Sequence, residues 1–398
     1  MQFQILYRYL NLPVKNGAPM RQVSLRVGGQ LVRQFEMELA ESTPDFWAFL
    51  DLSDWMGQAA VLQVEPPLDP PPGAVLFEQS QTIKGGEDLY REKLRPGFHF
   101  TCRRGWNNDP NGLLYTQGEY HLFFQHNPYG IHWGNMHWGH AVSRDLLHWE
   151  ELPEALYPDE LGAMFSGSGV VDEENTSGFQ TGHEKPLVLV YTAAGGANSL
   201  SQGQGFTQCL AYSNDRGRTW TKWAGNPVLP QVAGGNRDPK VIWHAPTRQW
   251  IMALYLEGND YALFTSNDLK AWTCLFDYSI PGCIECPDLF ELPVDGDPRD
   301  TRWVLWGSNT SYLIGRFDGQ AFIQESAVMG SHWGGNSYAA QTWSDIPPQD
   351  GRCIQISWLQ VEVPGMPFNQ GLTFPVELSL RSTPQGIRLC CSPVREIA

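Results

Sequence analysis

The sequence lacks any run of about 18 apolar residues, the length that a helix needs to cross a bilayer, so a transmembrane helix is excluded. Basic residues are also scarce. The 27 Lys and Arg residues are outnumbered by 43 Asp and Glu residues, which gives a formal net charge of −16. Because nucleic acids and anionic membranes select basic proteins, this balance argues against both as partners. A neutral substrate fits the composition better.

The N-terminus does not have the pattern of a signal peptide. Its first ten residues, MQFQILYRYL, lack a basic start followed by an uninterrupted apolar run. The eight cysteines are scattered along the chain, which favours reduced thiols and a cytoplasmic location. A secreted form from which a leader has been removed stays open.

Glycine, proline and tryptophan are plentiful, at 40, 29 and 16 residues. Turn-forming residues and aromatic residues that punctuate short segments favour an all-β protein. At 398 residues the chain is long enough for one large core or for two domains.

The first part of the chain predicts a small β domain. Residues 22–27 and 35–39 alternate apolar and polar side chains, the period of half-buried strands. A proline-rich stretch at 65–73 is incompatible with a central strand and suits a domain boundary. We therefore expect an accessory, sandwich-like β domain with its linker over residues 1–90, and a second domain over 91–398.

The second part contains a weak internal repeat. SRDLLHW at 143–149 recurs as SNDLKAW at 266–272, and a version one residue longer, SNDRGRTW, occupies 213–220. Each copy follows a short β-like run, so we expect hairpins in which the Asp organises a tight turn and the Trp packs on the next strand. Repeated four-stranded units of this kind predict a β-propeller, and roughly 300 residues would give about five blades.

Three carboxylates lie in constrained settings. Asp109 is followed by Pro110 and Gly112, which predict a rigid turn, while Asp238 stands between Arg237 and a proline, and Glu285 lies between two prolines. Taken singly, Asp109 fits a turn residue, Asp238 an ion-pair partner of Arg237, and Glu285 an exposed glutamate. Taken together, among aromatic and amide side chains that suit a sugar ring, they point to carbohydrate chemistry.

The chain resembles glycoside hydrolase family 32, the fructan hydrolases that include invertases, inulinases and levanases. The resemblance covers about residues 95–398 and depends on seven motifs in the family's order. They are WNNDPNG (106–112), FQHNP (124–128), WGNMHWGH (133–140), FSGS (165–168), RDP (237–239), ECPD (285–288) and YAAQTW (338–343). It implies a five-bladed β-propeller. It also implies an exo-acting β-fructofuranosidase that retains anomeric configuration and needs no cofactor. The C-terminal β-sandwich that members usually carry is not present in residues 1–398, and whether it has been truncated or is lacking in the protein stays open.

The resemblance also implies a role for each carboxylate. Asp109 corresponds to the nucleophile, Glu285 to the acid/base and Asp238 to the transition-state stabiliser of a double displacement. We expect amide donors around Asp109 to favour its ionised form, while Glu285 must be protonated to act as the acid. These opposite requirements predict a bell-shaped pH–rate profile.

A sugar-binding wall is expected around the carboxylates. Its candidates are Asn108, Gln125, Trp133, Phe165, Ser166, Arg237, Trp333 and Tyr338. Trp358 is a weaker candidate, and Cys286 is expected to be a small buried residue without a nucleophilic role. Asn336 stands close to where many members have an Asp, so an uncharged amide that can still bond a hydroxyl replaces a carboxylate on the leaving-group side.

Other functions remain open or fail on inspection. A fructosyltransferase would use the same residues, and a non-catalytic fructan-binding propeller would need neither acid nor nucleophile. His132, His137 and His140 do not share a helix face, so we expect no metal. The expected partner is a fructan or sucrose, and the oligomeric state is left open.

Overall fold

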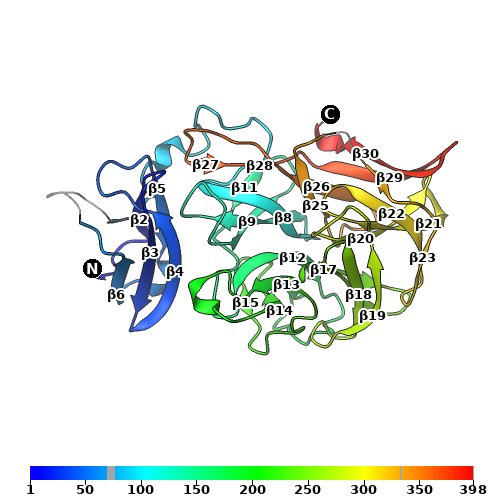
Figure 1. Ribbon diagram of the computed structural model, residues 1–398, viewed down its shortest axis with the longest axis horizontal. Helices are drawn as coiled ribbons and strands as arrows, with labels where there is room; N and C mark the ends of the chain where they lie inside the picture. The colour runs from blue at the N-terminus through cyan, green and yellow to red at the C-terminus, as the bar shows by residue number, and fades with distance from the viewer. Residues whose placement is uncertain (70–76, 332–333, 398) are drawn as a thin grey trace.

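The computed structural model describes residues 1–69, 77–331 and 334–397, and within them the protein is built from β-strands (Figure 1). These residues form thirty strands and four one-turn 3₁₀-helices. The short helices are η1 (Ser53–Trp55), η2 (Gly86–Asp88), η3 (Ser199–Ser201) and η4 (Arg395–Ile397). The all-β prediction is confirmed. No helix of the described residues is long and apolar enough to cross a membrane.

The N-terminal part forms two antiparallel sheets around one hydrophobic core. The first sheet has the order β1 (Gln2–Gln4), β6 (Ala59–Glu65), β3 (Met20–Val27) and β4 (Gln30–Glu38). The second has the order β5 (Phe46–Asp51), β2 (Tyr9–Val14) and β7 (Glu78–Ser80). Alternate side chains such as Val23, Leu25, Phe35 and Met37 point into the shared core, which is why the alternating pattern was legible in the sequence.

Beyond residue 100 the chain repeats one motif, four antiparallel strands joined in sequence order (Figure 1). The first array is β8 (Gly105–Thr116), β9 (Glu119–Asn127), β10 (His137–Ser143) and β11 (Trp149–Glu151). The second is β12 (Ala163–Val171), β13 (Leu187–Ala194), β14 (Phe206–Ser213) and β15 (Thr221–Lys222). The third is β16 (Arg237–His244), β17 (Gln249–Glu257), β18 (Asp260–Ser266) and β19 (Thr273–Ser279).

The last ten-stranded sheet contains two more such arrays. One is β20 (Asp288–Val294), β21 (Asp297–Trp306), β22 (Ser311–Phe317) and β23 (Phe322–Gln324). The other is β25 (Ser337–Thr342), β26 (Cys353–Leu359), β29 (Val376–Thr383) and β30 (Gly386–Pro393). A single parallel pairing of Val294 with Leu380 joins them. The short strands β24 (Met329–Gly330) and β28 (Gly371–Leu372) pair with β22 and β26.

The first strands of the five arrays contact one another in a closed cycle. Strand β8 contacts β12, and β12 contacts β16. Strand β16 contacts β20, β20 contacts β25, and β25 contacts β8 again. The strand β27 (Phe368–Asn369) pairs in parallel with the start of β8, so a late segment of the chain joins the first array. Residues from all five arrays can therefore meet at the centre of the cycle.

The repeated Ser-x-Asp segments form the predicted tight turns. Asp145 Oδ1 accepts hydrogen bonds from the backbone N–H groups of Leu147 and His148, at 3.0 and 2.8 Å. Asp215 and Asp268 accept the equivalent backbone bonds in the other two copies. The indole N–H of each following Trp donates to a backbone carbonyl within the turn. The repeat is thus a recurring turn that connects the last two strands of three arrays.

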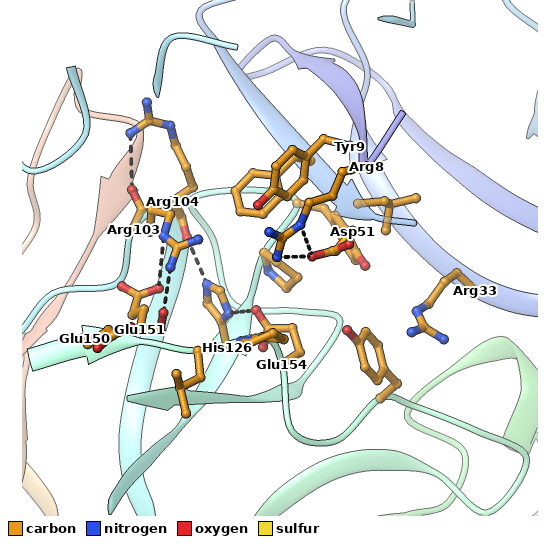
Figure 2. A pocket seen from close by; sticks show the side chains of 17 residues that line it. Arg8, Tyr9, Arg33, Asp51, Arg103, Arg104, His126, Glu150, Glu151 and Glu154 are labelled. Carbon is orange, nitrogen blue, oxygen red and sulfur yellow. Dashed lines mark hydrogen bonds and ion pairs between the residues drawn. The ribbon is translucent and has the colours of Figure 1, made fainter. Parts of the chain in front are cut away.

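The N-terminal sheets pack against the first array through a charged cavity of about 330 Å³ (Figure 2). Arg8 pairs with Asp51 at 2.8 Å on the N-terminal side, and His126 contacts Glu154 at 2.8 Å on the other. The Arg33 guanidinium lies over the Tyr157 ring, with 3.5 Å to its centroid. Most charges in this cavity face a partner in the protein, so the cavity belongs to the contact between the two parts.

Candidate active site

The three carboxylates line one cavity of about 180 Å³ at the end of the cycle of inner strands. Its other lining residues are Asn108, Gln125, Trp133, Phe165, Ser166, Arg237, Tyr338 and Trp358. The structure therefore brings together every candidate from the sequence except Trp333, which lies outside the described residues. The lining comes from β8, β9, β12, β16, β25, β26 and the two loops that carry Trp133 and Glu285.

Asp109 is presented by a bulged strand, so the expectation of a turn at this position is wrong. The pairing of β8 with β9 shifts between Asn107 and Pro110, which leaves Asp109 outside the regular ladder. Gly112 has a φ of +61°, and a Cβ there would lie 2.6 Å from the Phe123 ring. Proline and glycine serve the bulges and close packing of this strand.

Hydrogen bonds fix the Asp109 carboxylate. Asn108 Nδ2 donates to Oδ1 at 3.0 Å, and Ser166 Oγ donates to Oδ2 at 3.0 Å. Burial raises the pKa of Asp109, and the nearby Glu285 charge raises it further. The donors lower the pKa as expected from the sequence, but burial outweighs them.

Asp238 lies in a left-handed backbone conformation, with a φ of +64°, at a second bulge between Arg237 and Lys240. Its backbone N–H donates to Thr192 Oγ1 at 3.0 Å. Burial raises its pKa to about 7; Arg237 opposes this, and Glu285 adds to it. Arg237 remains 4.0 Å away, so its pairing with Asp238 is loose.

Glu285 faces the same cavity from the loop before β20. It has a φ of +57°, and the following Cys286 has a φ of +40°. Arg237 donates to Oε1, and the Tyr338 hydroxyl donates to Oε2 at 2.6 Å. Tyr261 donates to the Glu285 carbonyl at 3.3 Å. Non-glycine residues with positive φ cost about 1–3 kcal/mol each, so this loop stores backbone strain that the surrounding contacts maintain.

Cys286 has a role that sequence reasoning missed. Its backbone N–H donates to Asp238 Oδ2 at 3.0 Å. Its thiol lies 3.5 Å from Asp109 Oδ2 and 3.5 Å from Asp238 Oδ2, so it bridges two carboxylates. Burial and the three neighbouring carboxylates raise the pKa of this thiol, which keeps its proton and donates it. It is also only half-buried, against expectation, and its position next to Glu285 was the signal available.

Aromatic side chains form the rim. Trp133 is 56% exposed, and its ring meets the Phe165 ring edge-on at 6.0 Å between centroids. Trp358 packs edge-on against Trp106 at 6.1 Å. Asn336 instead donates to the Gln360 carbonyl at 3.0 Å and does not line the cavity.

The arrangement suits chemistry on a neutral ring. The floor carries three carboxyl groups and their donors, and the rim carries aromatic faces that suit sugar C–H groups. Among the described residues, no three His, Cys, Asp or Glu side chains gather in a way that would hold a metal ion. His137 and His140 lie in β10, where His140 contacts His121 at 3.0 Å.

Comparisons with known proteins agree with the motifs. Residues 99–393 match the model of the glycosyl hydrolases family 32 N-terminal domain. The levanase of Bacillus subtilis is 46% identical over 332 residues, which are 77% of this chain and 48% of the levanase. The extracellular exo-inulinase of Aspergillus niger is 38% identical over 342 residues, 74% of this chain and 63% of the inulinase. The chain thus spans about half to two thirds of these relatives.

A solved structure is also similar to this chain. The crystal structure of exo-inulinase from Aspergillus awamori superposes with a TM-score of 0.69 at 34% sequence identity. The match covers 76% of this chain and 68% of that one.

Proposed function

Because the chain belongs to glycosyl hydrolase family 32, we propose that it is a retaining exo-β-fructofuranosidase that releases terminal fructose from levan, inulin or sucrose. The observation that carries this proposal is that Asp109, Asp238 and Glu285 share one small cavity. Its volume of about 180 Å³ and its aromatic rim suit a single terminal sugar unit, as exo-cleavage requires.

In the first step, the Asp109 carboxylate attacks the anomeric carbon of the terminal fructosyl unit. Glu285 gives its proton to the glycosidic oxygen, the bond to that oxygen breaks, and the leaving sugar departs as an alcohol. In the second step, the ionised Glu285 takes a proton from water, whose oxygen attacks the anomeric carbon and releases Asp109. Arg237 and Tyr338 hold the Glu285 carboxylate between the two steps.

Asp238 stabilises the transition state. As the ring acquires oxocarbenium character, a carboxylate that accepts hydrogen bonds from fructosyl hydroxyls interacts more strongly with it than with the ground state. The shared contact of Cys286 with Asp109 and Asp238 keeps these two groups on the same side of the cavity.

The fold proposal follows from the strand contacts. We assign the five four-stranded arrays as five propeller blades, since their first strands contact one another in a closed cycle. We likewise retain the division into an accessory domain over residues 1–90 and a catalytic domain over 91–398. The separate hydrophobic core of the first two sheets supports this division, although Tyr129 of the catalytic part also packs into that core.

The cytoplasmic location expected from the sequence is not supported by the relatives, one of which is named an extracellular enzyme. A fructan or sucrose remains the proposed partner. The Bacillus subtilis relative is named a levanase and the Aspergillus niger relative an exo-inulinase, so levan and inulin are both candidate substrates.

Fructose release from sucrose, inulin and levan tests the proposal. We expect free fructose from the first minutes, without the early short oligosaccharides that cleavage inside the chain would release, because an exo-enzyme removes one terminal unit at a time. With methanol as acceptor, retention gives methyl β-fructofuranoside, which NMR identifies. Binding without fructose release would favour a non-catalytic protein, and longer oligosaccharides at high sucrose would favour a transferase.

A further inference from the structure

A second, larger hollow borders the catalytic cavity. Its volume is about 390 Å³, against about 180 Å³ for the catalytic cavity, and Trp133 and Phe165 line both. One wall comes from β3 and β4 of the N-terminal sheet, and the opposite wall from residues 196–202 around η3. The hollow therefore continues the catalytic cavity onto the N-terminal part of the protein.

The polar lining of this hollow consists mainly of neutral hydrogen-bonding groups. We call the hollow the amide groove, after its lining residues Gln22, Gln34, Asn135, Asn198, Ser199 and Gln202. Glu36 is the only charged side chain among the described residues that line it. Amides both donate and accept hydrogen bonds, which is what a neutral, hydroxyl-rich ligand requires.

The two walls of the groove are joined across it. Gln22 Nε2 donates to Ser199 Oγ at 2.9 Å, and Ser199 Oγ donates to Gln34 Oε1 at 3.1 Å. These contacts join strands β3 and β4 to a loop more than 150 positions away in the sequence. The amide groove is therefore held in shape before any ligand enters.

The N-terminal sheet also positions the loop of Trp133, one of the two residues shared with the catalytic cavity. Asn135, two residues after Trp133, accepts from the Glu36 backbone N–H at 2.9 Å and donates to the Glu36 carbonyl at 2.7 Å. Asn127 accepts from Asn135 at 3.0 Å and donates to the His132 carbonyl at 2.8 Å. The loop that carries Trp133 is thus held by Asn127 and by Glu36 of β4.

We propose that the amide groove binds the sugar units of a fructan chain that follow the terminal fructosyl unit, so that the N-terminal domain confers a preference for fructans over sucrose. This inference rests on the proposed function. The groove has about twice the volume of the catalytic cavity, which leaves room for about two further units. Exposed Trp133 supplies an aromatic face at the point where a fructan would pass from the catalytic cavity into the amide groove. The charged cavity of Figure 2 differs, because its polar lining consists mainly of ionisable groups, among them the Arg8–Asp51 pair and the His126–Glu154 contact, rather than neutral amides.

The test compares sucrose with the chain-length series 1-kestose, nystose and inulin. The double variant Gln22→Ala/Gln34→Ala of the full chain is expected to raise KM for nystose and inulin about tenfold, while kcat and the kinetics on sucrose stay unchanged. The matched control is Gln30→Ala/Gln63→Ala, which removes two exposed glutamines of the same sheet that do not line the groove. The control is expected to behave as the parent on every substrate.

A second variant guards against a change in domain packing. Ala197→Trp fills the groove from the opposite wall while the bonds of Ser199 to Gln22 and Gln34 stay in place, and it is expected to give the same selective rise in KM. The inference is overturned if both groove variants affect sucrose and nystose equally, or affect neither.

Calorimetric binding separates this inference from the proposed function. Nystose is titrated into the parent chain and into the groove variants on an Asp109→Asn background. If the parent released no fructose yet nystose binding weakened in the groove variants alone, the proposed function would fail and the groove would stand. If fructose were released and binding were the same in all variants, the groove assignment alone would fail.

Discussion

Lys240 and Asp288 form an ion pair in the interior of the cycle of inner strands, with 3.4 Å between Nζ and Oδ1. Their side chains are 1% and 0% exposed. Thr342 joins them, since its carbonyl accepts from Lys240 at 2.6 Å and its N–H donates to Asp288 at 2.6 Å. The three residues lie on β16, β20 and β25, within four positions of Asp238, Glu285 and Tyr338. The pair therefore sets the spacing of the strands that carry the site.

Removing one member of this pair should be costly. Asp288→Asn leaves the Lys240 ammonium buried without its counter-charge, and we expect a loss of about 3–5 kcal/mol in the free energy of unfolding. The double variant Lys240→Met/Asp288→Leu should lose less than the sum of the single variants, because neither charge remains. Urea unfolding measures all of them. Strict additivity of the single losses would contradict the coupling.

The Cys286 thiol should matter as a donor rather than as a nucleophile. Cys286→Ala removes the contacts to Asp109 and Asp238, and we expect kcat to fall about tenfold, the scale of one hydrogen bond to a charged group. Cys286→Ser keeps a donor and should retain most of the activity. Because its pKa is raised, Cys286 should also react slowly with iodoacetamide at neutral pH. Rapid inactivation of the parent by alkylation of Cys286 would contradict this.

Asp238 should lower stability at neutral pH. Its folded-state pKa of about 7 exceeds its ordinary value of 3.8, so the folded protein binds this proton more tightly than the unfolded chain. Stability from this group is complete below about pH 4 and is lost as the pH rises through 7. We expect the free energy of unfolding of Asp238→Asn to exceed that of the parent by about 1–3 kcal/mol at pH 8. At pH 4 the two free energies should differ little.

A remote carboxyl group provides the control for Asp238. Burial also raises the pKa of Asp345 to about 7, and its Oδ2 accepts from the Val171 N–H at 2.7 Å, outside the catalytic cavity. Asp345→Asn should give the same pH-dependent gain in stability with activity kept, whereas Asp238→Asn should lose activity. A gain that is equal at pH 4 and pH 8 would rule out titration as its cause.

Asp109→Asn should abolish turnover in a folded protein. An amide does not form the glycosyl ester, so we expect kcat to fall by about 10⁴-fold or more on sucrose and on inulin alike. Thermal unfolding confirms that the variant is folded, and release of fructose is followed by an enzyme-coupled assay. Near-normal activity in a folded variant would remove Asp109 from the nucleophile's position.

The Tyr338 hydroxyl should position the Glu285 carboxyl group. It donates to Glu285 Oε2 at 2.6 Å. Tyr338→Phe removes this donor, and we expect kcat on sucrose to fall about tenfold, the scale of one hydrogen bond to a charged group, while thermal unfolding shows that the fold is kept. An unchanged kcat in the folded variant would mean that this bond does not hold Glu285 in its working position.

Much of the site was predictable because its residues stand in short, ordered motifs. The turn geometry of Asp145, Asp215 and Asp268 was also legible, since each side chain bonds within three or four residues of itself. The bulge that presents Asp109 was read as a turn, because proline and glycine serve both. The positive φ of Glu285 and Cys286 leaves no local signature in non-glycine residues.

Contacts between distant segments were beyond prediction. Gln22 and Gln34 alternate with apolar residues like any exposed strand positions, and nothing in that pattern says what the exposed face meets. Their neighbour Ser199 comes from another part of the chain, brought there by the packing of whole sheets. The strands of the N-terminal sheets were therefore predictable, whereas their contact with the loop at Ser199 was not.

The parallel pairing of β27 with β8 bears on the order in which the cavity can form as the chain is synthesised. Strand β8, with Asp109, is made long before its partner Phe368–Asn369. Tyr338, which donates to Glu285, is also made after all three carboxylates. A nascent polypeptide therefore carries the acidic groups before it carries the segments that pair with β8 and hold Glu285.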